Sequence, residues 1–185
     1  TCLLRMGGIY TPKHVQSLKQ QFDKHCKTPF AFVCLSDVNI PGVTTIPLSF
    51  TRDDCPGWWG QVEYFRKDLF PATASILACD LDNVVLKDFT MHQCPAGSLF
   101  TGREIGDWLK STWAVWNFGV TYWRGDFSYV YDKYATDIHH YYKHPHYQHI
   151  SVQEFVYDTL RSHEVYPRCV DAHIMTRFYN GPDKR

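Results

Sequence analysis

Two carboxylates that stand two residues apart carry the strongest chemical signal in this chain. Asp80 and Asp82 follow the apolar run Ala74–Cys79, which is typical of a buried strand. In an extended segment, residues i and i+2 point to the same side, so both carboxylates face one place. A hard divalent cation, Mn²⁺ or Mg²⁺, relieves their mutual repulsion and lost hydration. The spacing therefore predicts a metal site that can hold a diphosphate; an acidic turn between two strands is the alternative.

The elements that must position these carboxylates follow from the apolar pattern. A strand over Thr1–Met6, a helix from Thr11 to His25 and a strand over Phe30–Leu35 open the chain. This strand–helix–strand order predicts an α/β fold with a mainly parallel, mixed central sheet flanked by helices. Further strands are predicted over Thr44–Ile46, Ala74–Cys79, Ser98–Thr101 and Gly119–Trp123, and further helices over Gln61–Phe65, Phe127–Tyr134 and Val152–Leu160.

Length and composition set the outer limits of the interpretation. A chain of 185 residues suits one domain over residues 1–185. Lys plus Arg and Asp plus Glu both number 19, so no overall charge favours nucleic acid or an anionic membrane. No apolar run reaches the roughly 20 residues that span a bilayer. The seven cysteines are scattered without CxxC pairs, and we therefore expect a reducing, cytoplasmic location.

Several segments of the chain, taken in order, are similar to one family. Asp80-Leu-Asp82 resembles the DxD motif of GT-A glycosyltransferases, which bind a nucleotide-sugar diphosphate through a divalent metal. The other segments resemble small bacterial and viral members or the retaining family-eight enzymes: Gly57-Trp-Trp-Gly60 with Glu63-Tyr-Phe-Arg66, the "N-x-G-V" strand Trp116-Asn-Phe-Gly-Val-Thr-Tyr-Trp123, and the "Asp-Gln" segment Ser151-Val-Gln-Glu-Phe-Val156. The resemblance extends to about Tyr179 and implies the Rossmann-like GT-A fold of nucleotide-diphospho-sugar transferases.

The resemblance also implies where a donor, most simply a UDP-sugar, would lie. The first loop would cradle the base and ribose, because its glycines permit close backbone approach. Arg66 would face the diphosphate, with a solvated helix arginine as the alternative, and one of the paired tryptophans would lie in the site and the other in the core. The residues implied at the donor are Met6, Gly7, Gly8, Tyr10, Asp37, Trp59, Arg66, Asp80, Leu81 and Gly119.

Two further residues match positions near the transferred sugar. Asn117 corresponds to the family asparagine that touches the sugar, and Gln153 to the glutamine near the reacting anomeric carbon. The family aspartate before that glutamine is replaced by Val152, and on a helix the next residue, Glu154, points about 100° away from Gln153. The implied reaction displaces a nucleoside diphosphate from the sugar; in a retaining enzyme the departing phosphate oxygen takes the acceptor proton. An inverting enzyme would need a carboxylate base, for which the candidates are Asp107, Asp126 and Glu154.

Histidines in two parts of the chain are candidate metal ligands. In the family a late histidine frequently completes the metal shell, and His173 is the candidate here, with Asp171 or a purely surface role for His173 as alternatives. The histidine-rich stretch His139–His149 has spacings that could bind zinc. Because Pro145 breaks the helix that would align these histidines, we predict an exposed loop near the acceptor and not the catalytic metal site.

These observations together predict a metal-dependent glycosyltransferase acting on an acceptor hydroxyl. The acceptor stays open among glycan, protein, small molecule and modified nucleobase. A nucleotidyltransferase shares the strand, the paired aspartates and the metal, but its first loop normally carries basic residues, which Gly7-Gly8-Ile-Tyr10 lacks. A degenerate GT-A domain that serves as a binding or scaffolding module is the third reading, and Val152 is its best support.

Overall fold

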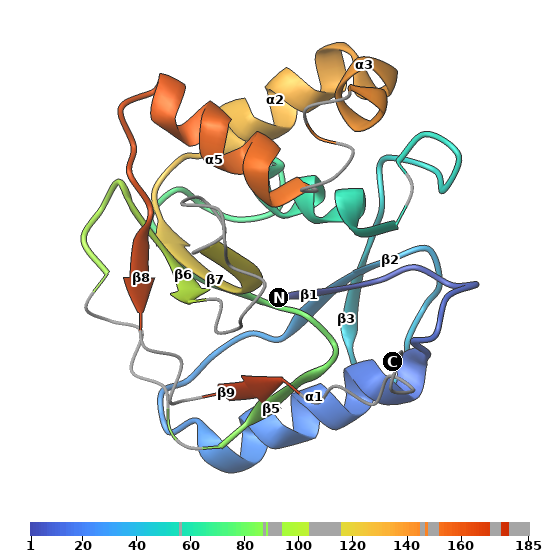
Figure 1. The fold of residues 1–185 in the computed structure, drawn as a ribbon. Coiled ribbons are helices and arrows are strands. Elements are labelled where there is room, and N and C mark those ends of the chain that lie inside the picture. Colours follow the sequence, from blue (N-terminus) through green and yellow to red (C-terminus); the bar gives the residue numbers. More distant parts are fainter. Residues whose placement is uncertain are drawn as a thin grey trace, which may run out of the picture.

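The computed structural model describes residues 1–55, 57–86, 88, 94–103, 116–144, 147, 152–170 and 175–177, with the backbone alone at 103, 116–117, 169–170 and 175–177 (Figure 1). The strands are β1 (Cys2–Leu4), β2 (Val33–Ser36), β3 (Thr44–Pro47), β4 (Ser75–Cys79), β5 (Asn83–Val85), β6 (Ser98–Arg103), β7 (Trp116–Arg124), β8 (Arg168–Val170) and β9 (Met175–Arg177). The helices are α1 (Pro12–His25), the 3-10 helix η1 (Gly57–Phe65), α2 (Ser128–Thr136), α3 (Ile138–Lys143) and α5 (Val152–Ser162).

The start of the chain, up to Pro47, forms the predicted strand–helix–strand unit and one further strand. β1, β2 and β3 pair in parallel, with Cys2 opposite Cys34 and Cys34 opposite Thr45. Helix α1 begins where the sequence places it, because Pro12 occupies the first turn and the Thr11 N–H donates to Nδ1 of His14 at 3.0 Å. The mixed α/β architecture predicted from the sequence is confirmed.

The two larger sheets of the molecule are continuous with one another. The second sheet has the order β4-β7-β6-β8, in which β7 runs antiparallel to both neighbours and β8 runs parallel to β6. The Thr1 amino group donates to the Leu77 carbonyl, and the Cys79 N–H donates to the Thr1 carbonyl at 2.9 Å. In parallel strands, one residue bonds to two residues that stand two positions apart on the neighbouring strand, as Thr1 does with Leu77 and Cys79. β1 therefore lies parallel beside β4. Among the described strands, the order is β3-β2-β1-β4-β7-β6-β8, and within it β7 alone is reversed.

Helices cover both faces of this sheet. α1 lies on one face, and η1, α2 and α5 lie on the other (Figure 1). Each face has its own apolar cluster: Val15, Leu18 and Phe22 of α1 pack on one side, whereas Tyr134 and Phe155 belong to the other. The sheet is therefore the middle of three layers, and its strand ends are the places left for binding.

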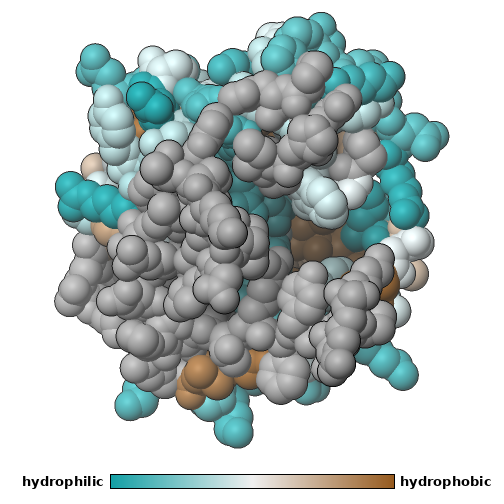
Figure 2. All heavy atoms as spheres, viewed as in Figure 1, coloured by the Kyte–Doolittle hydropathy of each residue, from teal (hydrophilic) through white to brown (hydrophobic). Residues whose placement is uncertain are grey.

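The structure differs from the sequence-based elements in several places: the second strand spans Val33–Ser36 and not Phe30–Leu35, η1 begins at Gly57 and not Gln61, and β5, β8 and β9 were not predicted. Two further differences have a clear local cause. Strand β1 spans Cys2–Leu4 and not Thr1–Met6, because the Met6 N–H bonds to a side chain and leaves the strand ladder. The prediction of a loop from His139 is wrong for Ile138–Lys143, which forms helix α3: the Asp137 carboxylate accepts the His140 N–H at 2.9 Å and caps this helix. Hydrophilic side chains do cover α3, as Figure 2 shows at the top of the molecule.

A buried carboxylate ties three segments together beneath the strand ends. Glu63, in η1, is fully buried, and its oxygens accept the N–H groups of Ser49 at 2.7 Å and Phe50 at 3.1 Å. Arg5, just after β1, lies 3.7 Å from Glu63, and Arg66 lies 3.2 Å from it. Such a buried charge is tolerated because it is both paired and hydrogen-bonded.

Replacing Glu63 with Gln should lower the free energy of unfolding by about 3–5 kcal/mol, since it leaves two arginines without their shared buried counter-charge. The matched control is Asp68→Asn, which removes the exposed partner of Arg66. A surface pair of this kind contributes under about 1 kcal/mol. Urea unfolding of both variants measures the difference; equal losses would show that Glu63 is not the structural centre described here.

Candidate functional site

The two aspartates lie in a turn at the carboxyl end of β4. Asp80 directly follows the strand, and Leu81 and Asp82 form the turn that leads into β5. The pair therefore does not stand on an extended segment as the spacing predicted, and the turn between two strands is the local geometry. Leu81 is buried in the cluster on the α1 side, whereas Asp80 and Asp82 are half-buried. Both acidic residues thus flank an anchored apolar side chain.

Asn83 fixes this turn against β7. Its side-chain amide donates to the Asp80 carbonyl at 3.1 Å and to the Gly119 carbonyl at 2.6 Å. The Asp80 N–H also donates to the Gly119 carbonyl, at 2.8 Å. Asn83 is 6% exposed, so these bonds are shielded from water. Sequence reasoning missed this positioning role, although an amide directly after the acidic pair is a signal for it.

Gln61 is a second residue that sequence reasoning missed. Its amide donates to Oδ1 of Asp80 at 2.7 Å, from the middle of η1. The buried phenol of Tyr64, one turn further along η1, is near the same carboxylate: burial raises its pKa well above the ordinary value, and the charge of Asp80 adds to that effect. η1 therefore lies against the acidic turn and orients one of its carboxylates.

The loop after β1 lies at the same edge of the sheet. The Met6 N–H donates to both oxygens of Asp37, at 3.0 and 3.1 Å, so the ends of β1 and β2 are joined. Gly7 has φ +90°, and a Cβ built there would lie 2.2 Å from the Arg52 guanidinium. Nη1 of Arg52 donates to the Met6 carbonyl at 3.3 Å. The loop requires glycine at this position, and Arg52 is the cation that covers it.

The other two first-loop residues expected at the donor are Gly8, which has free space beside it, and Tyr10, which packs against α1. A Cβ built at Gly8 meets nothing within 4 Å, so space is available beside it. Tyr10 is half-buried and its ring meets the His14 ring edge-on, with centroids 5.5 Å apart.

Two residues expected at the donor lie elsewhere. Trp59 is buried in the aromatic cluster and stacks on Tyr134 at 5.3 Å, whereas Trp58 is 65% exposed. One tryptophan of the pair is in the core, as expected. It is Trp59, however, which we had expected at the donor. Arg66 binds Glu63 and Asp68 and donates to the Pro47 carbonyl at 2.8 Å. Those contacts raise its pKa and hold it in the packing of η1, away from the acidic turn.

The first turn of α5 presents one accessible candidate and two buried residues. Gln153 is half-buried, Val152 is 1% exposed within the apolar cluster, and Glu154 is 5% exposed. The position of the family aspartate is therefore taken by a core residue. Glu154 lies close enough to Tyr147 for its charge to add to the effect of burial, which raises that phenol's pKa to about 12. Its burial argues against a role as base for an acceptor hydroxyl.

Asp126, another candidate base, lies at the opposite edge of the sheet. It follows β7 and accepts the Ser128 N–H at 2.9 Å; hydrogen bonds from Ser128 lower its pKa. It lines a small cavity with Ile76 and Trp123. These contacts give Asp126 a role at the start of α2.

Several expected residues lie outside the described part of the structure. These are His173, Asp171, Asp107 and, within the histidine-rich stretch, His146 and His149, together with the side chain of Asn117. Within the stretch, Nδ1 of His139 lies 3.1 Å from the Tyr142 hydroxyl, and the rings of His140 and His144 are 5.2 Å apart. Among the described residues, no three His, Cys, Asp or Glu side chains gather as a metal-binding group.

Comparison of the chain with protein-family models and with curated proteins finds no match. The helices of the described residues include none with the length and apolar character needed to cross a membrane.

Changing Asn83 to Ala should lower the free energy of unfolding by about 1–3 kcal/mol, because two buried hydrogen bonds to carbonyl oxygens are lost. Hydrogen exchange of the Asp80 amide should accelerate, since the turn is no longer fixed to Gly119. Asn39→Ala is the control, because Asn39 is exposed and should stay within about 0.5 kcal/mol of wild type. Unaltered exchange at Asp80 in Asn83→Ala would contradict the positioning role.

Proposed function

We propose that this protein is a metal-dependent glycosyltransferase that moves a sugar from a nucleoside-diphosphate sugar to an acceptor hydroxyl. The observation that carries the proposal is the acidic turn Asp80–Asp82 at the carboxyl end of β4, beside the glycine loop that follows β1. Both lie at the strand ends where parallel α/β sheets bind ligands.

The order of the strands supports this location. From β1 the chain passes through α1 to β2 on one side, while β4 lies on the other side of β1. A crevice opens at such a switch point, between the loops of the two diverging strands. Gly7 and Asp80 belong to those two loops. An order of β3-β2-β1-β4-β7-β6-β8 with β7 reversed also suits the GT-A fold that the sequence resemblance implies.

The chemistry of the donor set fits Mn²⁺ or Mg²⁺. Asp80 and Asp82 provide carboxylate oxygens, which these hard cations prefer, and Gln61 orients one of them. When bound, the cation would neutralise charge that develops on the departing diphosphate. Arg52 adds a positive charge beside the glycine loop, a role we had expected of Arg66. Asn117 and Gln153 would contact the transferred sugar.

A nucleotidyltransferase is the second candidate, and one observation favours it. Its first loop normally carries basic residues, and Arg52 supplies a guanidinium to a loop whose own sequence has none after Arg5. Product analysis with Mn²⁺ separates the two reactions. Nucleoside diphosphate released from a panel of nucleotide sugars identifies the glycosyltransferase, whereas pyrophosphate released from a nucleoside triphosphate and a sugar phosphate identifies the alternative. Donor binding without either product would indicate a binding module.

Asp82→Asn should abolish Mn²⁺-dependent donor binding and leave the melting temperature unchanged or slightly raised. The variant loses a charged oxygen ligand, and it also relieves repulsion between two carboxylates. Thermal shift with a nucleotide-sugar panel, with and without Mn²⁺, measures both effects. Asp23→Asn on the far face of α1 is the control. Retained metal-dependent binding in Asp82→Asn would remove this turn from the metal site.

Gln153→Ala should lower turnover at least tenfold while donor affinity changes little. If the side chain faces charge that develops at the anomeric carbon, its contribution grows in the transition state and appears in kcat. Arg161→Ala, at the exposed end of the same helix, should keep full turnover. Steady-state kinetics with the identified donor compare the two variants; full turnover in Gln153→Ala would exclude the residue from the site.

A further inference from the structure

The 3-10 helix η1 presents three rows of side chains to its surroundings. In a 3-10 helix the side chains at positions i and i+3 lie above one another, so residues three apart form a row along the helix. One row belongs to the apolar cluster of the core; its members are Trp59, Val62 and Phe65. A second row packs against the end of β1. A Cβ built at Gly60 would lie 3.2 Å from the Leu3 side chain, and Glu63 is paired with Arg5.

The third row, formed by Trp58, Gln61 and Tyr64, is aligned with the acidic turn. The Gln61 amide donates to Oδ1 of Asp80 at 2.7 Å. Burial raises the pKa of Tyr64, and the charge of Asp80 adds to that effect. Exposure increases along the row: Tyr64 is 5% exposed, Gln61 is half-buried and Trp58 is 65% exposed. The row therefore leads from the core past the Asp80 carboxylate to solvent, and Trp58 is about 6 Å along the helix axis from Gln61.

The backbone before Trp58 leaves free space beside its side chain. Gly57 has φ +59°, a left-handed conformation that favours glycine. A Cβ built at Gly57 meets nothing within 4 Å, so the surface next to Trp58 is open. An indole this exposed is uncommon, because tryptophan is highly buried on average in folded proteins. Trp58 therefore offers a flat apolar ring to a ligand, one helical turn from the group that orients Asp80.

A sugar ring is the ligand that matches this surface. The faces of a pyranose carry C–H groups that pack on an aromatic ring, while its hydroxyl groups need polar partners at the rim. The turn that leads into η1 supplies the carboxylates of Asp53 and Asp54, which accept hydroxyl hydrogens. Bonds from the Thr51 hydroxyl and N–H to Asp54, at 2.6 and 3.2 Å, hold this turn closed. The two negative charges oppose nucleic acid or an anionic lipid as the ligand.

The position of Trp58 separates an acceptor from the donor. In the proposed reaction the donor diphosphate would lie at Asp80 and Asp82 and its base at the glycine loop, which fills the inner part of the crevice. Trp58 lies on the solvent side of Gln61, where a second substrate would approach. We propose that Trp58 is the platform for a sugar ring of the acceptor, which makes the acceptor a glycan or a glycoside. This assignment rests on the proposed glycosyltransferase function.

Binding of simple sugars tests the platform without any donor. Methyl glycosides of glucose, galactose and N-acetylglucosamine, together with lactose and cellobiose, are added at millimolar concentration to isotope-labelled protein in NMR. The indole N–H signal of Trp58, identified as the one missing from Trp58→Phe, should shift with at least one of these sugars. Tyr166→Ala should keep the shift; it is the matched control, because Tyr166 is also 65% exposed but lies between α5 and β8.

Kinetics with an active nucleotide sugar and the same sugars as acceptors test the role in transfer. Trp58→Ala should raise the acceptor KM by about tenfold or more, because truncation of an aromatic anchor removes much of its binding. The donor KM should change much less. Trp58→Phe keeps an aromatic ring and should recover most of the acceptor affinity, which a purely structural role of the indole does not require.

An unmoved Trp58 signal with every sugar, or an unchanged acceptor KM in Trp58→Ala, would overturn the platform. A shift caused by uridine, adenosine or guanosine, or a rise confined to the donor KM, would assign Trp58 to the donor and overturn it as well. Failure of the proposed function gives a different result. If wild-type protein releases nucleoside diphosphate from no nucleotide sugar while sugars still shift the Trp58 signal, the reaction is refuted, and the acceptor role with it, but a sugar site remains.

Discussion

The buried charge of Glu63 is the constraint on which the geometry of the binding edge depends. Its carboxylate joins Arg5 after β1, the backbone at Ser49 and Phe50 after β3, and Arg66 at the end of η1. The fixed position of η1 allows Gln61, two residues before Glu63, to reach Asp80. The segment after β3 is held at Ser49 and Phe50. Arg52, two residues after Phe50, covers the glycine loop. A single desolvated carboxylate therefore orients groups on both sides of the proposed crevice.

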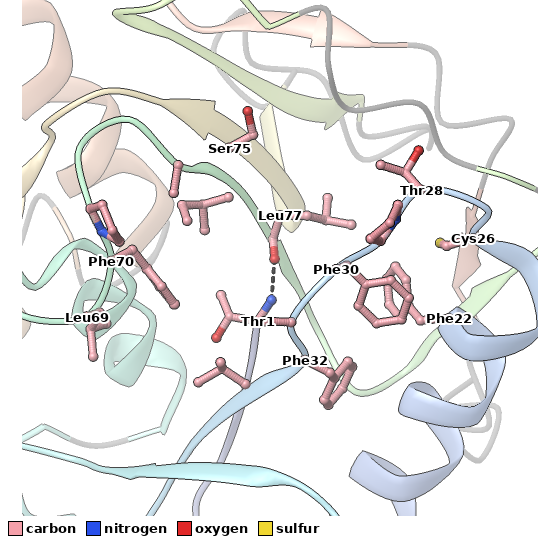
Figure 3. A pocket seen from close by; sticks show the side chains of 16 residues that line it. Thr1, Phe22, Cys26, Thr28, Phe30, Phe32, Leu69, Phe70, Ser75 and Leu77 are labelled. Atoms are coloured by element: carbon pink, nitrogen blue, oxygen red, sulfur yellow. Dashed lines mark hydrogen bonds between the residues drawn. The ribbon is translucent and has the colours of Figure 1, made fainter.

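The two ends of the sheet differ in chemistry for a topological reason. At the carboxyl ends, loops leave β1, β2 and β4 in different directions, and polar groups such as Asp37 and Asn83 satisfy the backbone there. At the amino ends of β2 and β4, a groove is lined by aromatic and aliphatic side chains (Figure 3). The sugar nucleotide that we propose as donor suits the polar edge.

Local patterns predicted those elements whose signals are contained in a few neighbouring residues. The Pro12 start of α1, the apolar run of β4 and the period of α5 were all readable from the sequence. The assignments that failed depend on distant contacts. Trp59 and Trp58 have the same neighbours in sequence, and only packing against Tyr134 separates them. Arg66 resembled a diphosphate ligand, but its partners include Pro47, nineteen residues away in the chain. The loop predicted where helix α3 forms was wrong for a local reason: the Asp137 carboxylate caps the segment and stabilises it as a helix.

The burial of the first turn of α5 bears on the stereochemistry of the proposed reaction. Val152 is in the core and Glu154 is nearly so, while Asp126 accepts the Ser128 N–H at the start of α2, at the other edge of the sheet. These placements argue against Glu154 and Asp126, two of the three carboxylates that we considered as a base; the third, Asp107, lies outside the described residues. Without such a base, the simplest route passes the acceptor proton to the departing phosphate oxygen on the same face of the sugar. In the reaction that we propose, that route corresponds to retention, which is also the outcome that the sequence resemblance implies.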